Sequence, residues 1–184
     1  MGDKYNKVLY STKWIDLMEM RDVDNGVQGY VYTHSKWTNG KAIAILPYRE
    51  LRENEYEYLL RHEVTPCWGL DPVVSSITGG MDKFGESPIE CAVRELEEEA
   101  GYRVESYYTR WHALGKIRMG KSSTTVMTLF GVDLTGLEQG EAPGDGTELE
   151  ALASCEWHKN LDEAGDAVTL ALGFRLTEFL RSRK

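Results

Sequence analysis

The residues with the clearest potential for chemistry are three glutamates spaced to share one face of a helix. Glu95 and Glu99 are four positions apart, and Glu98 follows Glu95 by three. In an α-helix these spacings place side chains about one turn apart on a common arc. Because like charges repel at such short range, we expect a compensating partner, and a divalent cation is the usual partner of gathered carboxylates.

The helix expected to carry these glutamates has recognisable ends. Ser87 is a candidate N-cap, Pro88 suits the first helical position, and Glu90 completes a capping box. Gly101 suits the left-handed position that often follows a helix, so we expect the helix at residues 88–100. Apolar residues recur at helical spacing and should face a core: Ile89, Ala92, Val93, Leu96 and Ala100.

Two glycines ahead of the helix are expected in a turn that approaches a ligand. Gly79 and Gly80 lack side chains, and a carbonyl oxygen from either could join the carboxylates around a hard cation. Mg²⁺ suits such oxygen ligands, and Mn²⁺ could substitute for it. The alternative is a solvated acidic helix face, which we retain only for Glu90 and Glu97. For the other three glutamates, the repulsion and the glycine turn favour a metal site.

The complete pattern resembles the signature box of the Nudix hydrolases. A chance match has a probability on the order of 10⁻¹⁰ per starting position, given average residue usage. Tyr102 is the loosest fit, since an aliphatic residue is more usual there. The matching positions are Gly80, Glu86, Arg94-Glu95-Leu96, Glu98-Glu99 and Gly101-Tyr102.

The resemblance implies a role for each residue of the box. Glu95 and Glu99 would be the chief metal ligands, with Glu98 beside them and a carbonyl of Gly79 or Gly80 completing the site. Arg94 and Glu86 would orient the acidic side chains. The family often takes a further catalytic carboxylate from a later loop. Glu148 and Glu150 are the candidates for it here, although an exposed acidic loop is the alternative for both.

The reaction implied is hydrolysis of a phosphoanhydride bond. Cations would bridge the diphosphate and lower the pKa of an attacking water, and a carboxylate would accept its proton. A β-rich N-terminal extension and the stretch 42–49 resemble the ADP-ribose and nucleotide-sugar members, where the extension helps to build a homodimer. The alternatives are a nucleoside triphosphate pyrophosphohydrolase and a non-catalytic nucleotide-sensing module. The module is disfavoured because all the box glutamates are present.

Three further residues are candidates for binding the substrate. Arg49 and Arg61 could each hold a phosphate, although either could instead pair with a nearby glutamate. Trp68 could stack on a base, although packing is the commoner fate of an aromatic residue near a core.

Composition narrows the class of partner. The net charge of −9 argues against nucleic-acid binding, which depends on Lys and Arg, and favours a small-molecule nucleoside diphosphate substrate. The three cysteines are scattered without metal spacing, which indicates a reducing cytoplasmic location. No apolar stretch is long enough to span a membrane, and no signal peptide is evident.

The expected elements define an α/β fold. We predict a β-rich N-terminal extension at residues 1–40 and a Nudix hydrolase domain at 41–184. Strands followed by a helix, then strands and a final helix indicate an α/β/α sandwich with a mixed central sheet. The final helix is expected at 167–181, capped by Asp166. Strands are expected at 8–14, 27–34, 42–46, 56–62, 73–77, 103–114, 124–133 and 153–158.

Overall fold

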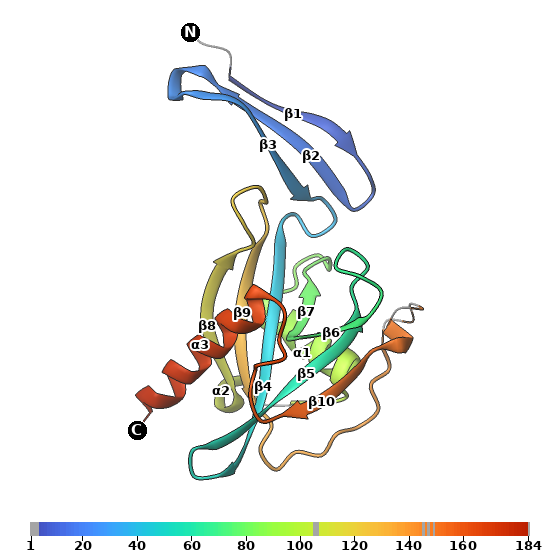
Figure 1. Ribbon diagram of the computed structural model, residues 1–184, viewed down its shortest axis with the longest axis vertical. Coiled ribbons are helices and arrows are strands. Elements are labelled where there is room, and N and C mark those ends of the chain that lie inside the picture. Colours follow the sequence, from blue (N-terminus) through green and yellow to red (C-terminus); the bar gives the residue numbers. More distant parts are fainter. Residues whose placement is uncertain (1–3, 105–106, 145, 147, 149, 184) are drawn as a thin grey trace.

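The chain forms two β-sheets and a small set of helices (Figure 1). The computed structural model describes residues 4–104, 107–144, 146, 148 and 150–183. The helical elements are η1 (Val23–Asn25), α1 (Pro88–Ala100), α2 (Tyr107–Arg110), η2 (Glu150–Leu152) and α3 (Ala167–Ser182). The strands are β1 (Lys4–Ser11), β2 (Ile15–Asp22), β3 (Val27–Ser35), β4 (Lys41–Arg52), β5 (Glu55–Val64), β6 (Pro72–Ser75), β7 (Ile77–Gly80), β8 (Trp111–Arg118), β9 (Val126–Asp133) and β10 (Ser154–His158).

The larger sheet has seven strands and is mixed. Its main path runs β10-β5-β4-β9-β8, with β6 paired to β5 and β7 paired to β4. The β4–β9 pair is parallel and the other pairs are antiparallel. Strand β4 is long enough to pair with β7 near its start and with β5 near its end. This arrangement brings the glycines of β7 beside the centre of the sheet.

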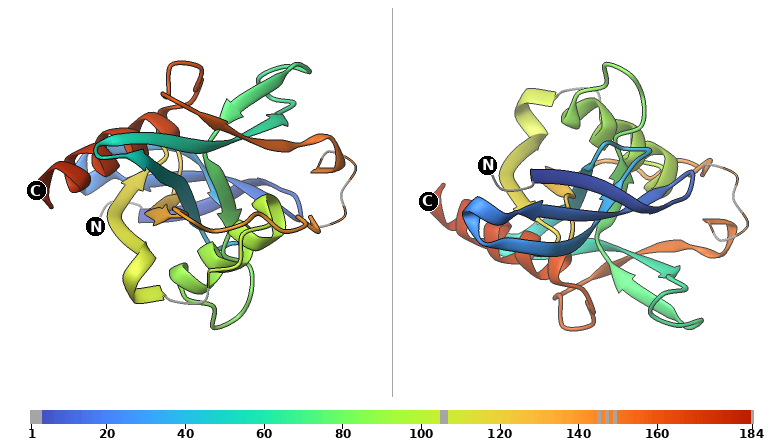
Figure 2. Two further views of the ribbon diagram at one scale, coloured as in Figure 1. Left: turned by 90° about the horizontal axis from the view of Figure 1, so that it is seen from below. Right: turned by 90° about the horizontal axis from the view of Figure 1, so that it is seen from above.

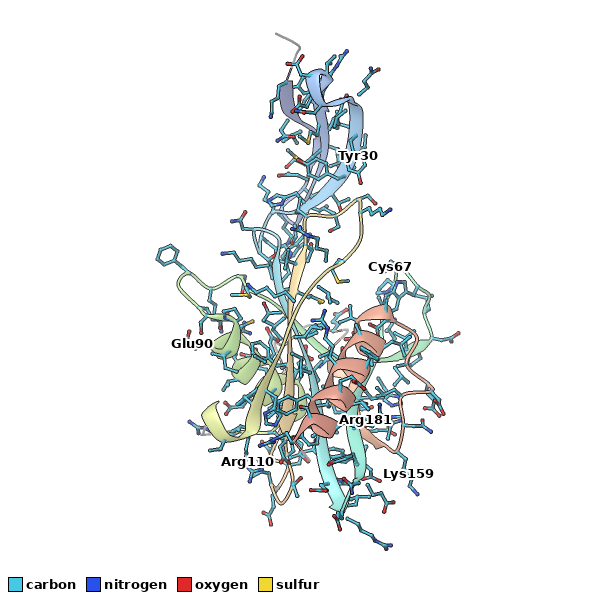
Figure 3. The ribbon with its side chains drawn as sticks, turned by 90° about the vertical axis from the view of Figure 1, so that its left-hand side faces the viewer. Tyr30, Cys67, Glu90, Arg110, Lys159 and Arg181 are labelled. Atoms are coloured by element: carbon cyan, nitrogen blue, oxygen red, sulfur yellow. The ribbon has the colours of Figure 1, made fainter. Side chains whose placement is uncertain are left out.

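Helices α1 and α3 cover opposite faces of this sheet. Side chains alternate along β4, so Ile43 and Ile45 join the core beneath α1, whereas Ala44 and Leu46 join the core beneath α3. Figure 3 shows α1, which carries Glu90, and α3 with Arg181 on the two sides of the sheet. The predicted α/β/α sandwich with a mixed central sheet is therefore confirmed.

The first three strands form a separate antiparallel sheet in the order β1-β2-β3. This sheet projects beyond the sandwich in Figure 1, and its strands lie in front of the sandwich when the molecule is seen from above (Figure 2, right). It is joined to the hairpin between β8 and β9 by backbone hydrogen bonds from Thr33 N–H to the Ser122 carbonyl and from Thr124 N–H to the Thr33 carbonyl. Strand β2 was not predicted, because its mixture of Met and acidic residues is a weak strand signal.

The predicted ends of the two long helices are confirmed. The Ser87 hydroxyl oxygen accepts a hydrogen bond from Glu90 N–H, the Glu90 carboxylate accepts one from Ser87 N–H, and Gly101 is left-handed at φ 70°. Asp166 caps α3 by accepting hydrogen bonds from the backbone N–H groups of Val168 and Thr169. Side chains within one turn supply these caps, which is why sequence alone located them.

Two predicted segments differ from the structure. The strand expected at 103–114 begins only at Trp111, after the short helix α2, and residues 105–106 lie outside the described part. Gly79 and Gly80 lie at the end of β7 rather than in a turn, because their backbones pair with Ile43 and Ala42. Among the described residues, no helix combines the length and apolar character needed to cross a membrane.

Candidate active site

The glutamates of α1 and the glycines of β7 meet at one pocket of about 550 Å³. Because α1 packs against β7 and the start of β4, the helix presents its acidic edge to the end of the strand. The described residues that line the pocket are Trp37, Thr78, Gly79, Gly80, Asp82, Lys83, Arg94, Glu95, Glu98, Glu99 and Gly144. The structure therefore brings the three predicted glutamates and the two predicted glycines to one pocket.

The two glycines are required for close packing at the pocket wall. A Cβ atom at Gly79 would lie 2.3 Å from Glu95 Cγ, and one at Gly80 would lie 2.4 Å from Trp37 Cη2. Such distances are far below van der Waals contact, so any side chain at these positions would displace its neighbour. The absence of a side chain at Gly79 is what lets the Glu95 carboxylate lie against the strand.

Arg94 organises the carboxylates on one side of the pocket. Its Nη1 donates to Glu95 Oε1 and to Glu98 Oε2, both at 2.8 Å, and its Nε donates to Glu86 Oε1 at 3.0 Å. The hydrogen bond from Arg94 lowers the pKa of the Glu86 carboxyl, and the same bond raises the pKa of the Arg94 guanidinium. Arg94 therefore joins Glu86, Glu95 and Glu98 in one hydrogen-bonded network.

Arg61 holds the remaining carboxylate of the trio. Its Nη1 lies 2.9 Å from Glu99 Oε2, its Nε donates to Glu63 Oε2 at 2.9 Å, and its side chain is only 5% exposed. Burial lowers the pKa of Arg61, but the charges of Glu99 and Glu63 outweigh burial and leave the pKa raised. Arg61 was expected either to hold a phosphate or to pair with a glutamate, and in the structure it pairs with glutamates. Any effect of Arg61 on a substrate would therefore act through the position of Glu99.

Two other predicted binding residues lie elsewhere. Arg49 donates to Glu57 Oε2 from Nε at 2.9 Å and from Nη2 at 2.6 Å, and its guanidinium stacks over the Trp157 ring at 4.2 Å. Trp68 is 59% exposed. Neither is among the described residues that line the pocket. Gly79 pairs with Ile43 near the start of β4, whereas Arg49 lies near the end of that strand.

Glu148 and Glu150, the two candidates for a catalytic carboxylate from a later loop, follow the pocket residue Gly144 in the sequence. Neither is among the described residues that line the pocket. The N–H of Gly144 donates to the Glu98 carbonyl at 2.9 Å, which anchors the loop over α1. Glu148 is exposed and follows Gly144 by four positions. Glu150 begins η2.

Four pocket residues with side chains were not predicted: Trp37, Thr78, Asp82 and Lys83. Thr78 directly precedes Gly79, and Asp82 and Lys83 follow Gly80 after one residue, so their position in the chain was a usable signal. Trp37 comes from the turn before β4, and its ring meets Trp14 edge-on with centroids 5.5 Å apart. This turn lies beside Gly79 and Gly80 because β4 pairs with β7, and that pairing is evident only in the structure.

The donor set fits a hard divalent cation. Glu95, Glu98 and Glu99 supply carboxylate oxygens at one pocket, and the backbone of Gly79 lies close against the Glu95 side chain. Carboxylate and carbonyl oxygens are the ligands preferred by Mg²⁺ and Mn²⁺. Cys91 on α1 is buried and is not among the described residues that line the pocket, and desolvation raises its pKa to about 12, which disfavours the thiolate.

Comparisons with known proteins agree with this geometry. The family model of the NUDIX domain matches residues 39–171. A solved structure described as "Crystal structure of ADP compounds hydrolase" matches with a TM-score of 0.70 and 18% identity, over 97% of this chain and 93% of the other. At that identity the likeness concerns the fold. No curated protein sequence matches the chain significantly. Because the family match spans well over half of the chain, the protein belongs to the NUDIX domain family and is a Nudix hydrolase.

Proposed function

We propose that this protein hydrolyses the phosphoanhydride bond of a nucleoside diphosphate joined to a second moiety, with ADP-ribose or a nucleotide sugar as substrate. The observation that carries the proposal is the single pocket that gathers Glu95, Glu98 and Glu99 against the backbone of Gly79 and Gly80. The printed description of the structural neighbour, an ADP compounds hydrolase, supports ADP derivatives as the first compounds to test.

The proposed cofactor is Mg²⁺, with Mn²⁺ as a substitute. Glu95, Glu98 and Glu99 would hold it together with a carbonyl of Gly79 or Gly80. When bound, the cation offsets the charge of the diphosphate and lowers the pKa of the attacking water. Arg94 and Arg61 keep the three carboxylates in place, since each arginine is itself anchored by a further glutamate outside the trio.

Other residues of the pocket suit the remaining tasks. The ammonium of Lys83 would attract the diphosphate. Glu98 is the most accessible of the trio, with 30% of its side chain exposed against 12% for Glu95 and 9% for Glu99. We therefore propose Glu98 as the proton acceptor, with Glu148 as the alternative. Trp37 is the proposed stacking surface for the base, in place of Trp68.

Hydrolysis of the proposed substrates is expected to depend on Mg²⁺. With Mg²⁺ present, ADP-ribose or a nucleotide sugar should release a nucleoside monophosphate, and excess chelator should abolish the activity. Coupled detection of AMP and of phosphate across a panel of nucleoside diphosphate derivatives measures both effects. Retained activity in excess chelator would contradict the metal mechanism.

The same panel distinguishes the alternative functions. Release of pyrophosphate from nucleoside triphosphates, with no cleavage of diphosphate derivatives, would replace the proposed substrate class. Binding without hydrolysis of any compound, unaffected by Glu98→Gln, would favour the nucleotide-sensing module.

We also propose that the N-terminal extension, residues 1–40, mediates a homodimer. A small sheet that projects from the body has little core of its own, and its strands expose apolar side chains. Strand register places Tyr10, Leu17 and Val31 on one face of this sheet, with exposures of 65%, 36% and 45%. A second copy of the chain would cover this face.

Light scattering tests the homodimer. The wild-type chain should have twice the mass of one chain, and Leu17→Lys combined with Val31→Lys should shift it to the monomer mass. Leu170→Lys is the matched control, because Leu170 is 53% exposed on α3 in the other part of the molecule. A monomeric wild-type protein, or a dimeric double variant, would contradict the proposal.

The cysteines support a proposed cytoplasmic location. The described structure holds Cys67, Cys91 and Cys155 as free thiols. Desolvation raises the pKa of Cys155 to about 12, as it does for Cys91, so both are unreactive packing residues. A reducing compartment suits a chain with such thiols.

A further inference from the structure

A second group of potential metal ligands lies outside the catalytic pocket, on strands β5 and β10. On β10, Ser154 lies opposite His62 of β5, Glu156 lies opposite Leu60, and His158 lies opposite Tyr58. Along the sheet, Glu156 therefore lies between the two histidines. The three potential ligands, His62, Glu156 and His158, share one face because side chains alternate along a strand. Leu60 on this face belongs to the core beneath α3. Glu99 contacts the neighbouring Arg61, which points to the opposite face.

The ligand atoms of this group already lie close together. One nitrogen from each histidine and one carboxylate oxygen of Glu156 all lie within 4.8 Å of one another. The Nε2 atoms of His62 and His158 are 2.9 Å apart, and their ring centroids are 5.1 Å apart. Two imidazole nitrogens bound to one tetrahedral Zn²⁺ would be separated by about 3.3 Å, from Zn–N distances of about 2.05 Å. Occupancy therefore requires only a small rotation of the rings.

A second carboxylate lies beside one of the histidines. Glu163 Oε2 lies 3.4 Å from His158 Nδ1, on the opposite side of the ring from Nε2. Histidines that bind a metal through one nitrogen commonly donate the other N–H to a carboxylate, which fixes the tautomer. The loop that carries Glu163 is held in place by the pairing of Ala164 with Val74 and by a hydrogen bond from Gly165 N–H to the Val74 carbonyl.

We propose that His62, Glu156 and His158 form a binding site for a divalent transition-metal ion of the Zn²⁺ class, separate from the catalytic carboxylates. Two imidazoles with one carboxylate are typical of Zn²⁺, whereas Mg²⁺ prefers oxygen ligands alone. The half-buried histidines would hold the ion between β5 and the edge strand β10, and water or a further carboxylate would fill the remaining position. The alternative for the same contact is an N–H···N hydrogen bond between two neutral imidazoles.

Calorimetric titration with Zn²⁺ tests the site. The metal-free full chain is titrated in excess Mg²⁺, so that Mg²⁺ competes for the proposed catalytic carboxylates. One equivalent of Zn²⁺ should bind to wild type, His62→Gln and His158→Gln should weaken binding by roughly tenfold or more, and Glu163→Gln should weaken it by roughly tenfold. His34→Asn is the control, because His34 contacts Thr124 away from this group and should leave the affinity unchanged.

Nuclear magnetic resonance of the wild-type chain provides a test that does not depend on the variants folding. The imidazole nitrogen signals of His62 and His158 should shift when Zn²⁺ is added, and those of His34 and His112 should not. Unmoved signals of His62 and His158, or equal Zn²⁺ affinity in wild type and in folded His62→Gln and His158→Gln, would overturn the proposal and leave the hydrogen bond as the account of the contact.

Discussion

Replacing Glu99 with glutamine is expected to lower turnover by about 10²–10³-fold, the range observed when a charge-stabilising group is removed from an active site. The change keeps the size of the side chain but removes a negative charge from the pocket lining, where the cation is proposed to bind. Steady-state hydrolysis of the best substrate from the panel, measured in Mg²⁺, gives kcat and KM separately. If kcat falls while KM stays unchanged, Glu99 makes an interaction in the transition state that the bound substrate alone does not make.

The matched control for this variant is Glu97→Gln on the same helix. Glu97 is outside the described lining of the pocket, so the control should retain nearly full turnover. Glu99 also carries the ion pair with the buried Arg61, so some loss of melting temperature is expected in Glu99→Gln. If the variant melted earlier but kept wild-type turnover, Glu99 would be a structural partner of Arg61 and not a catalytic residue.

Adding a single methyl group at Gly79 is expected to reduce activity by about 10²-fold, the effect of misplacing a catalytic group by about 1 Å. In Gly79→Ala the new Cβ would overlap Glu95 Cγ, Cδ and Oε1, which lie 2.3–2.5 Å from its ideal position. The carboxylate must therefore move, although no charged group has been removed. Turnover of the same substrate, together with the Mg²⁺ concentration needed for half-maximal activity, measures the effect.

A glycine elsewhere and a double-mutant cycle make the test specific. Gly165→Ala is the control, because a Cβ at Gly165 meets nothing within 4 Å. If Gly79→Ala acts by displacing Glu95, it should have little further effect in a chain that already carries Glu95→Ala, since the crowded side chain is then absent. Fully additive losses, or wild-type activity in Gly79→Ala, would contradict this account.

The residues predicted from sequence to bind the substrate are not among the described residues that line the pocket. Arg49 and Trp68 had suitable chemistry for phosphate and base, but strand register places Arg49 against Glu57 and Trp157. Trp37 lines the pocket instead, from a turn that precedes the first strand of the main sheet. Nothing in the local sequence around Trp37 distinguishes it from the other tryptophans. Its position depends on how β3, β4 and β7 meet.

The sequence by itself determined the helix α1, its two caps, its apolar face and the arc shared by Glu95, Glu98 and Glu99. These features depend on residues close together in the chain, and in a helix the number of residues between two side chains sets their relative direction and distance. Only the tertiary structure decided that Arg61 holds Glu99, that Gly79 makes room for Glu95, and that His62 meets His158. Those contacts join segments far apart in the chain, and they exist only once strand register and the packing of helices on the sheet are set.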